Sequence, residues 1–99
     1  MTLLIPINDK FSQTISVVLS NQSCQINIYQ KATGLFCDLY VNSVLIIGGV
    51  ICENMNVIVR DTYLGFVGDL MFYDTQGKDD PSSPGLGTRF VLLYLEASN

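Results

Sequence analysis

The stretch FSQTISVVLSNQSCQINIY, residues 11–29, decides the fold. Its first half alternates, so that serine and threonine occupy one face and the other face carries Phe11, Ile15, Val17 and Leu19. A polar turn follows at 20–23, and the alternation resumes in Cys24–Tyr29. A repeat of two residues is typical of half-buried β-strands, and two such runs joined by a short polar turn predict a β-hairpin.

The same pattern continues downstream of the hairpin. Leu35–Asn42 alternates again, Asn42-Ser43 predicts a turn, and the Gly48-Gly49 pair is expected to break or bulge the apolar run Val44–Ile51. Further strands are expected at 56–60, 66–74 and 88–96. Between six and eight short strands, with no helical repeat, predict an all-β fold: a small antiparallel β-sandwich or a partly open β-barrel. We expect one domain over residues 1–99.

Two features of the C-terminal third are expected to meet a partner protein. Phe90–Leu95 is apolar at every position, which predicts a strand with both faces covered, either at the centre of a sheet or against another protein. The loop at 74–87 is long for a connection within a compact domain, and such loops are usually functional or mobile. We expect it to contact a partner. The candidate protein-interface residues are Asp79, Asp80, Pro81, Leu86 and Arg89.

The composition indicates that something other than solvent covers part of the surface. Hydrophobic residues make up 48% of the 99 residues, charged residues make up 14%, and the mean hydropathy is +0.36. Soluble domains have about 25% charged residues. A membrane is a poor explanation, because the longest apolar stretch, Val44–Cys52, is about half the ~18–20 residues of a spanning helix. A partner protein explains the excess better, since permanent interfaces resemble a core cut in half.

Charge and residue types exclude several classes of function. The net charge is −4 and the five Lys and Arg residues are scattered, which leaves no basic patch for nucleic acid. The chain has no histidine, the usual residue of catalytic triads and metal clusters. Cys24, Cys37 and Cys52 lie in apolar or alternating runs, so we expect three reduced thiols and folding in a reducing cytoplasm. We expect no catalytic residue, no metal site, no cofactor and no enzyme.

The charged residues around the long loop have alternative interpretations. Asp74, Asp79 and Asp80 could together bind a calcium ion, but their spacing matches no calcium loop, so we expect solvated turn residues. Arg89 opens the last strand and could form an ion pair with Asp69, Asp79 or Asp80, because its guanidinium suits bidentate contact with a carboxylate. The other possibility is an exposed charge at the end of a strand.

Several short segments occur in a characteristic order along nearly the whole chain. They are Leu4-Ile5-Pro6-Ile7, Gln13–Leu19, Ile26-Asn27-Ile28-Tyr29, Leu35–Leu39, Gly68-Asp69-Leu70, Asp74–Gly77, Asp80-Pro81 and Leu86–Arg89 running into Val91–Tyr94. In this order they resemble the phage baseplate plug family of contractile-tailed bacteriophages. One departure is Phe36, which stands where the family often has a Trp-like aromatic residue.

The resemblance implies a structural, non-enzymatic component of the tail baseplate, made and assembled in the bacterial host cytoplasm and carried in the virion. It would join the central hub and tail tube to the surrounding baseplate proteins, in several symmetric copies with three-fold or six-fold symmetry. The family brings no catalytic or cofactor residue, and the charge and the apolar stretches of the chain already led us to expect no nucleic-acid contact and no membrane insertion. The residues alone leave another possibility open, a small β-sandwich that recognises carbohydrate or a cell-surface receptor. The lack of Trp is unfavourable for that possibility.

Overall fold

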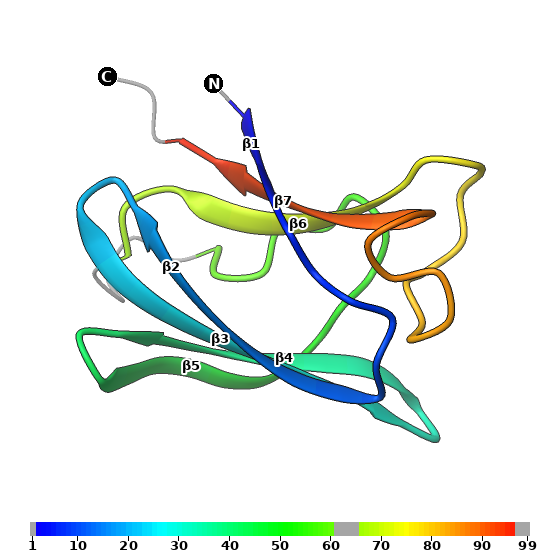
Figure 1. The fold of residues 1–99 in the computed structure, drawn as a ribbon, viewed down its shortest axis with the longest axis horizontal. Helices are drawn as coiled ribbons and strands as arrows, with labels where there is room; N and C mark the ends of the chain where they lie inside the picture. The colour runs from blue at the N-terminus through cyan, green and yellow to red at the C-terminus, as the bar shows by residue number, and fades with distance from the viewer. Residues whose placement is uncertain (1, 61–65, 97–99) are drawn as a thin grey trace.

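Two antiparallel β-sheets face each other in the computed structural model, which describes residues 2–60 and 66–96 (Figure 1). The sheet of three strands has the order β1-β7-β6, and the sheet of four strands has the order β2-β3-β4-β5. The strands are β1 (Thr2–Ile5), β2 (Ser12–Leu19), β3 (Gln22–Lys31), β4 (Gly34–Val41), β5 (Val44–Ile51), β6 (Asp69–Asp74) and β7 (Phe90–Leu95). The described residues contain no helix and no closed barrel, so the predicted all-β sandwich is confirmed.

The four-stranded sheet is a meander of hairpins. The predicted hairpin is confirmed, with Ser12 of β2 paired to Tyr29 of β3 and Leu19 paired to Gln22. Its turn is tighter than expected, since only Ser20 and Asn21 lie between the strands and both have a positive φ, 49° and 63°. Asn42 and Ser43 form a similar turn, with φ values of 51° and 66°. Positive φ at both central residues is the type I′ geometry that matches the twist of paired strands.

The glycine pair of β5 forms a bulge and does not end the strand. The register between β4 and β5 shifts on either side of Leu39, and β5 continues to Ile51. Gly49 has a φ of 64°, which side chains rarely allow, and its N–H donates to Asp38 Oδ1 at 2.7 Å. The bulge, one of the two predicted outcomes, is therefore fixed from the neighbouring strand.

Two predicted strand segments differ in the structure. The segment 56–60 is irregular chain beside β6, because the Asp69 carboxylate accepts the backbone N–H groups of Ile58, Val59 and Arg60 at 3.1, 2.8 and 2.8 Å. The strand expected at 66–74 begins only at Asp69, since Gly68 has a φ of 92° that ends the extended conformation. In addition, β1 forms at Thr2–Ile5, a segment for which the sequence analysis predicts no strand.

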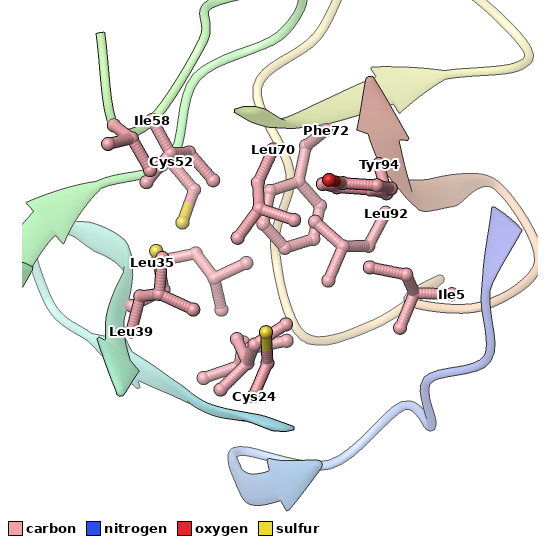
Figure 2. Close-up of a cluster of buried hydrophobic side chains, with 14 of the residues drawn as sticks. Ile5, Cys24, Leu35, Leu39, Cys52, Ile58, Leu70, Phe72, Leu92 and Tyr94 are labelled. Carbon is pink, nitrogen blue, oxygen red and sulfur yellow. The ribbon is translucent and has the colours of Figure 1, made fainter. Parts of the chain in front are cut away.

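The core fills the space between the sheets (Figure 2). The inward positions of β3 and β4 are buried as the alternation predicts, whereas Phe11 at the start of β2 is 72% exposed, contrary to its predicted place on the apolar face. Tyr94 is fully buried, and its hydroxyl bonds to the Val67 carbonyl and to Ser20 Oγ in the β2–β3 turn. Phe66 meets the Tyr94 ring edge-on at 5.8 Å. Tyr94 therefore ties β7 to the opposite sheet.

All three cysteines belong to this core and are free thiols, as predicted. Each is at most 3% exposed. The hydrogen bond with Cys37 and burial raise the pKa of the Cys52 thiol, and burial raises the pKa of Cys24. A raised pKa keeps a thiol protonated and unreactive, so these side chains act as small hydrophobic groups.

Candidate interaction site

The outer side of the three-stranded sheet is apolar. Alternate residues of β1, β6 and β7 point into the core, and the residues between them point outward. Thr2 and Asp69 take two of these outward positions. The others are apolar and are here called the apolar face: Leu4, Met71, Tyr73, Val91, Leu93 and Leu95. Leu4 is paired with Leu93, which is paired in turn with Met71, so the side chains form a continuous row across the sheet. Leu4 is 63% exposed and Tyr73 is 39% exposed. None of the six side chains carries a charge, which is unusual for a sheet face in contact with water.

The outer side of the four-stranded sheet has a mixed character. Its outward residues are mostly polar, for example Thr14, Ser16 and Asn27. One aromatic pair lies among them, with Tyr29 and Phe36 stacked at 6.2 Å. Lys31 Nζ lies 5.4 and 5.3 Å from these two ring centroids. Exposed apolar side chains lie on this side too, with Val18, Leu45 and Ile51 at 69%, 53% and 42% exposure, so it mixes hydrogen-bonding and apolar groups.

A hollow of about 210 Å³ lies where β1 continues past the end of β7. Its lining is Leu4, Ile5, Pro6, Ile7, Gly87 and Val91. Leu4 and Val91 belong to the apolar face, so the hollow continues that face toward the long loop. Its lining side chains are all apolar, which suits a hydrocarbon or aromatic group better than a polar ligand.

The 74–87 loop is held at its base by a group of charged side chains. Arg89 Nε donates to Asp74 Oδ1 and Arg89 Nη2 donates to Asp74 Oδ2, both at 2.9 Å, and Nη2 also donates to Asp79 Oδ2 at 2.8 Å. The Asp74 side chain is fully buried, that of Arg89 is 33% exposed, and that of Asp79 is 74% exposed. The bidentate contact fixes the guanidinium across the two ends of the loop.

Asp74 also organises the first turn of the loop. Its two carboxylate oxygens accept the backbone N–H groups of Gln76 and Asp79, each at 2.9 Å. The hydrogen bonds from Arg89 hold the pKa of Asp74 well below its usual range against the opposing effect of burial, and the two N–H groups act in the same direction as Arg89. Asp74 is therefore a buried carboxylate, and the prediction of a solvated turn residue at this position is wrong.

Further contacts connect the loop to the rest of the sandwich. Asp80 Oδ1 accepts the Asn54 N–H at 3.0 Å, and Gln30 of β3 accepts the Ser83 N–H at 2.8 Å. The Gly85 carbonyl accepts the N–H groups of Arg89 and Phe90 at 2.8 and 2.9 Å. The loop is thus bonded to both sheets and closes one end of the sandwich (Figure 1).

The five predicted interface residues lie in two environments. Asp79 and Asp80 are exposed and Arg89 is partly exposed, so their side chains are available to a partner. Pro81 and Leu86 are buried, and Leu86 belongs to the core at 2% exposure, so both support the loop from within. The interface role of all five stays a prediction.

The predicted ion pair of Arg89 is confirmed with Asp79, whereas Arg89 forms none with Asp69 or Asp80. Asp69 binds the backbone of the 58–60 segment, and Asp80 binds Asn54. The main partner, Asp74, is missing from the sequence expectation. A signal for it was present: an aspartate opening the turn Asp74–Gly77 typically accepts the N–H two residues on, which marks a fixed side chain.

Known chemical sites are absent from the described part of the chain. Residues 2–60 and 66–96 contain no group of three His, Cys, Asp or Glu side chains placed to hold a metal ion. The same residues contain no helix that is long and apolar enough to cross a membrane.

Comparison with known proteins supplies the biological context. The family model described as cyanophage baseplate Pam3 plug gp18 matches residues 2–97. The chain belongs to this family. Members of the family are structural components of the phage baseplate, so this baseplate plug protein is a bacteriophage structural protein of the tail baseplate. No curated protein matches the chain.

The family match confirms the resemblance found in the sequence. It covers the hairpin, the long loop and the last strand together, so the shared order of segments reflects one family and not separate weak motifs. A baseplate component works by contact with other baseplate proteins. This directs attention to the apolar face and the loop beside it.

Proposed function

We propose that this chain is a structural joint of the baseplate that links the central hub and tail tube to the surrounding baseplate proteins. The observation that carries the proposal is the apolar face of the three-stranded sheet, where Leu4, Leu93 and Met71 form a continuous apolar row across the strands. Apolar surface removed from water contributes about 25 cal/mol per Å². A subunit that spends its working life in an assembly can expose such a face because a neighbour covers it.

The 74–87 loop gives this joint a fixed shape. The Asp74–Arg89–Asp79 contacts and the hydrogen bonds to Asn54 and Gln30 hold the loop in place. The loop therefore presents Asp79 and Asp80 in fixed positions relative to the apolar face. Charged groups at the rim of an interface contribute to register and partner choice more than to affinity. The loop therefore selects the partner, and the apolar face supplies most of the binding free energy.

The proposal includes no enzymatic step and no cofactor. The buried thiols of Cys24 and Cys52 have raised pKa values, and the buried carboxylate of Asp74 is bonded to Arg89, so these groups are not free for acid–base or nucleophilic work. Several symmetric copies, three or six around the tail axis, would repeat the joint. Assembly would take place in the host cytoplasm, where free cysteines persist.

One experiment tests the role of the apolar face. Leu93→Glu places a charge at the centre of the face, and Ser16→Glu places the same charge on the outer side of the four-stranded sheet as a matched control. Each variant is supplied in trans to a phage that lacks the gene, and its amount in purified tails is measured. We expect Leu93→Glu to lower incorporation at least about tenfold, since burying a charge costs more than 1.4 kcal/mol, while Ser16→Glu incorporates normally.

The opposite result would remove the proposal. If folded Leu93→Glu entered tails as well as Ser16→Glu does, the apolar face would not be an interface. Circular dichroism and the thermal midpoint of each purified variant separate this outcome from misfolding.

A second candidate function, recognition of carbohydrate or a receptor, has one observation in its favour. The stacked Tyr29–Phe36 pair lies on the outer side of the four-stranded sheet among hydrogen-bonding side chains, as sugar-binding aromatic residues often do. Lys31 lies over both rings and the Tyr29 hydroxyl donates to Asp38 at 3.0 Å, so a sugar would have to displace an existing contact. Screening the parent chain and Phe36→Ala on a glycan array tests this function. If the parent binds a glycan and Phe36→Ala binds it equally well, the Tyr29–Phe36 pair is not the glycan site.

A further inference from the structure

Within residues 2–60 and 66–96, the outer edge of β1 has no strand paired to it, and the positions of its backbone hydrogen-bonding groups follow from the register. The Arg89 carbonyl accepts the Thr75 N–H at 2.8 Å, so Arg89 directs its backbone groups toward the β6 side. Backbone direction alternates along a strand. The backbone N–H and C=O groups of Leu92 and Tyr94 therefore point to β1 and form hydrogen bonds with those of Ile5 and Leu3. It follows that the N–H and C=O of Leu4, and those of Thr2, point away from the sheet.

Pro6 fits this alternation. It occupies the next outward position after Leu4, where its missing N–H removes no bond to β7. Proline is confined to such positions in sheets. The open edge thus consists of the backbone groups of Thr2 and Leu4 and the carbonyl of Pro6.

The other edges of the two sheets are managed differently. The edge of β6 is covered by chain, since Phe72 and Leu70 carbonyls accept the N–H groups of Met55 and Ile58, both at 2.9 Å. The edge of β5 is bulged at the glycine pair. The edge of β2 is open and uncharged like that of β1, but serine and threonine stand on its outer side where β1 has Leu4. Natural proteins usually protect edges with charges, bulges or covering chain, and β1 has none of these between Thr2 and Ile5.

The hollow lies directly beside this edge. Leu4 and Ile5 of β1 line it together with Pro6 and Val91. An apolar cavity of about 150 Å³ is enough to hold benzene. The hollow of about 210 Å³ therefore has room for one aromatic or large aliphatic side chain.

From this combination we infer that β1 accepts an extended, uncharged segment of a neighbouring baseplate protein, which adds a fourth strand to the three-stranded sheet and places one bulky apolar side chain in the hollow. This inference rests on the proposed function and names the contact that the joint uses. Strand addition gains affinity from backbone hydrogen bonds and specificity from the side-chain pocket. The edge of β1 supplies the backbone hydrogen bonds, and the hollow supplies the side-chain pocket.

A second copy of this chain is a poorer occupant. The edge is four residues long, about 13 Å. Two copies joined by this edge alone would bury less than the about 1,200–2,000 Å² of a stable pair. Each copy also carries a net charge of −4, which disfavours self-association. The edge suits one contact among several in a larger assembly.

Hydrogen–deuterium exchange tests the inference without knowledge of the neighbour. The rate of exchange is measured for the peptide that covers Thr2–Ile5, in the purified chain and in intact baseplates. We expect the amides of Thr2 and Leu4 to exchange rapidly in the free chain and at least about tenfold more slowly in the baseplate. The amide of Ser16, which points outward on the other open edge, should stay rapid in both.

Each alternative outcome is distinct. Equal exchange of the Thr2–Ile5 peptide in both states, in baseplates that contain the chain, would overturn the inference and leave the proposed function standing. Protection already present in the free chain, together with a dimeric mass, would replace the neighbour by a second copy. Baseplates that lack the chain would overturn both.

A backbone variant provides a second test. Leu4→Pro removes the outward N–H of Leu4 and keeps the bonds of Leu3 and Ile5 to β7, whereas Ser16→Pro removes the corresponding outward N–H of β2. Leu4→Ala controls for the lost side chain. We expect incorporation into baseplates to fall most for Leu4→Pro, with Ser16→Pro unaffected. Equal incorporation of folded Leu4→Pro and Ser16→Pro would contradict strand addition at β1.

Discussion

At the scale of single residues, Arg89 joins several parts of the structure through its side-chain contacts. Its guanidinium contacts two carboxylates, and its Cζ lies 5.0 Å from the Phe90 ring centroid. Because Asp74 is buried, removal of its partner leaves an uncompensated charge inside the protein. Arg89 is therefore a structural residue first, whatever contact it makes with a neighbour.

We predict that Arg89→Ala lowers the thermal midpoint by several degrees, and that Arg89→Lys lowers it nearly as much. Lysine keeps the charge but cannot form the bidentate contact with Asp74 Oδ1 and Oδ2. The measurement is a thermal melt at neutral pH. Asp79→Asn, which leaves the bidentate contact intact, serves as a control with a smaller effect. An unchanged midpoint for Arg89→Ala would show that the ion pair contributes nothing.

The low pKa of Asp74 predicts a loss of stability in acid. The folded state holds the Asp74 carboxyl below its ordinary value of 3.8, so the unfolded chain binds the proton first as the pH falls. The contribution is complete above about pH 5 and is lost progressively below about pH 4. Urea unfolding between pH 7 and pH 2.5 measures this. Asp74→Asn should have a shallower decline over the acid range; an identical decline would contradict the assignment.

At the scale of elements, the long loop behaves as part of the core. Leu86 is 2% exposed and packs with the β-strand residues, while Pro81 and Ser83 are buried beside it. Deletion of 82–85 would remove the Ser83–Gln30 bond and the Gly85 carbonyl together, so it would test folding more than binding. Point substitutions separate the two.

Leu86→Ala should lower the free energy of unfolding by about 2–5 kcal/mol, because it leaves a cavity where the loop meets the core. Pro84→Ala changes an exposed residue of the same loop and should cost under about 1 kcal/mol. Chemical denaturation of both variants gives the comparison. Similar, small losses in the two variants would mean that the loop is not held by its buried leucine.

The elements also show how far sequence reasoning reaches. Strands β2, β3 and β4 follow from alternation, because each has one buried face and a period of two is then unambiguous. The segment 56–60 misleads, because only Val57 pairs with β6, in an isolated bridge to Met71, while the Asp69 carboxylate accepts the N–H groups of the residues that follow. The apolar run of β7 is confirmed at the centre of its sheet, and its outward half supplies the apolar face.

The sequence predicts less of the candidate site than of the fold. Arg89 and Asp79 could be named from their positions, but the Asp74 contact depends on how β6 and β7 pair across the loop. The hollow depends on residues 4–7 meeting Gly87 and Val91, which are about eighty positions away in the chain. Only tertiary structure brings such distant residues together, so local patterns do not predict the hollow.

At the scale of the whole molecule, the apolar residues that exceed the needs of the core lie on the surface. The radius of gyration is 12.5 Å, close to the ~13 Å of a compact domain of this length. The accessible surface of 5743 Å² is near the ~5,600 Å² expected for 10.9 kDa. The chain is therefore packed as tightly as other small domains, and the surplus apolar residues lie on the outside of both sheets, for example Leu4 and Tyr73 on one and Val18 and Leu45 on the other.

This location leads to a prediction for the isolated protein. Purified chain should associate weakly as its concentration rises, because apolar faces of separate molecules cover one another when no baseplate neighbour is present. Light scattering over a range of concentrations measures the mean mass. Leu93→Lys, which charges the apolar face, should hold the mass near the monomer value of 10.9 kDa, and Ser16→Lys, on the outer side of the four-stranded sheet, should associate as the parent does. A parent chain that stays monomeric at millimolar concentration would contradict the prediction, since the exposed face would then be stable in water without a partner.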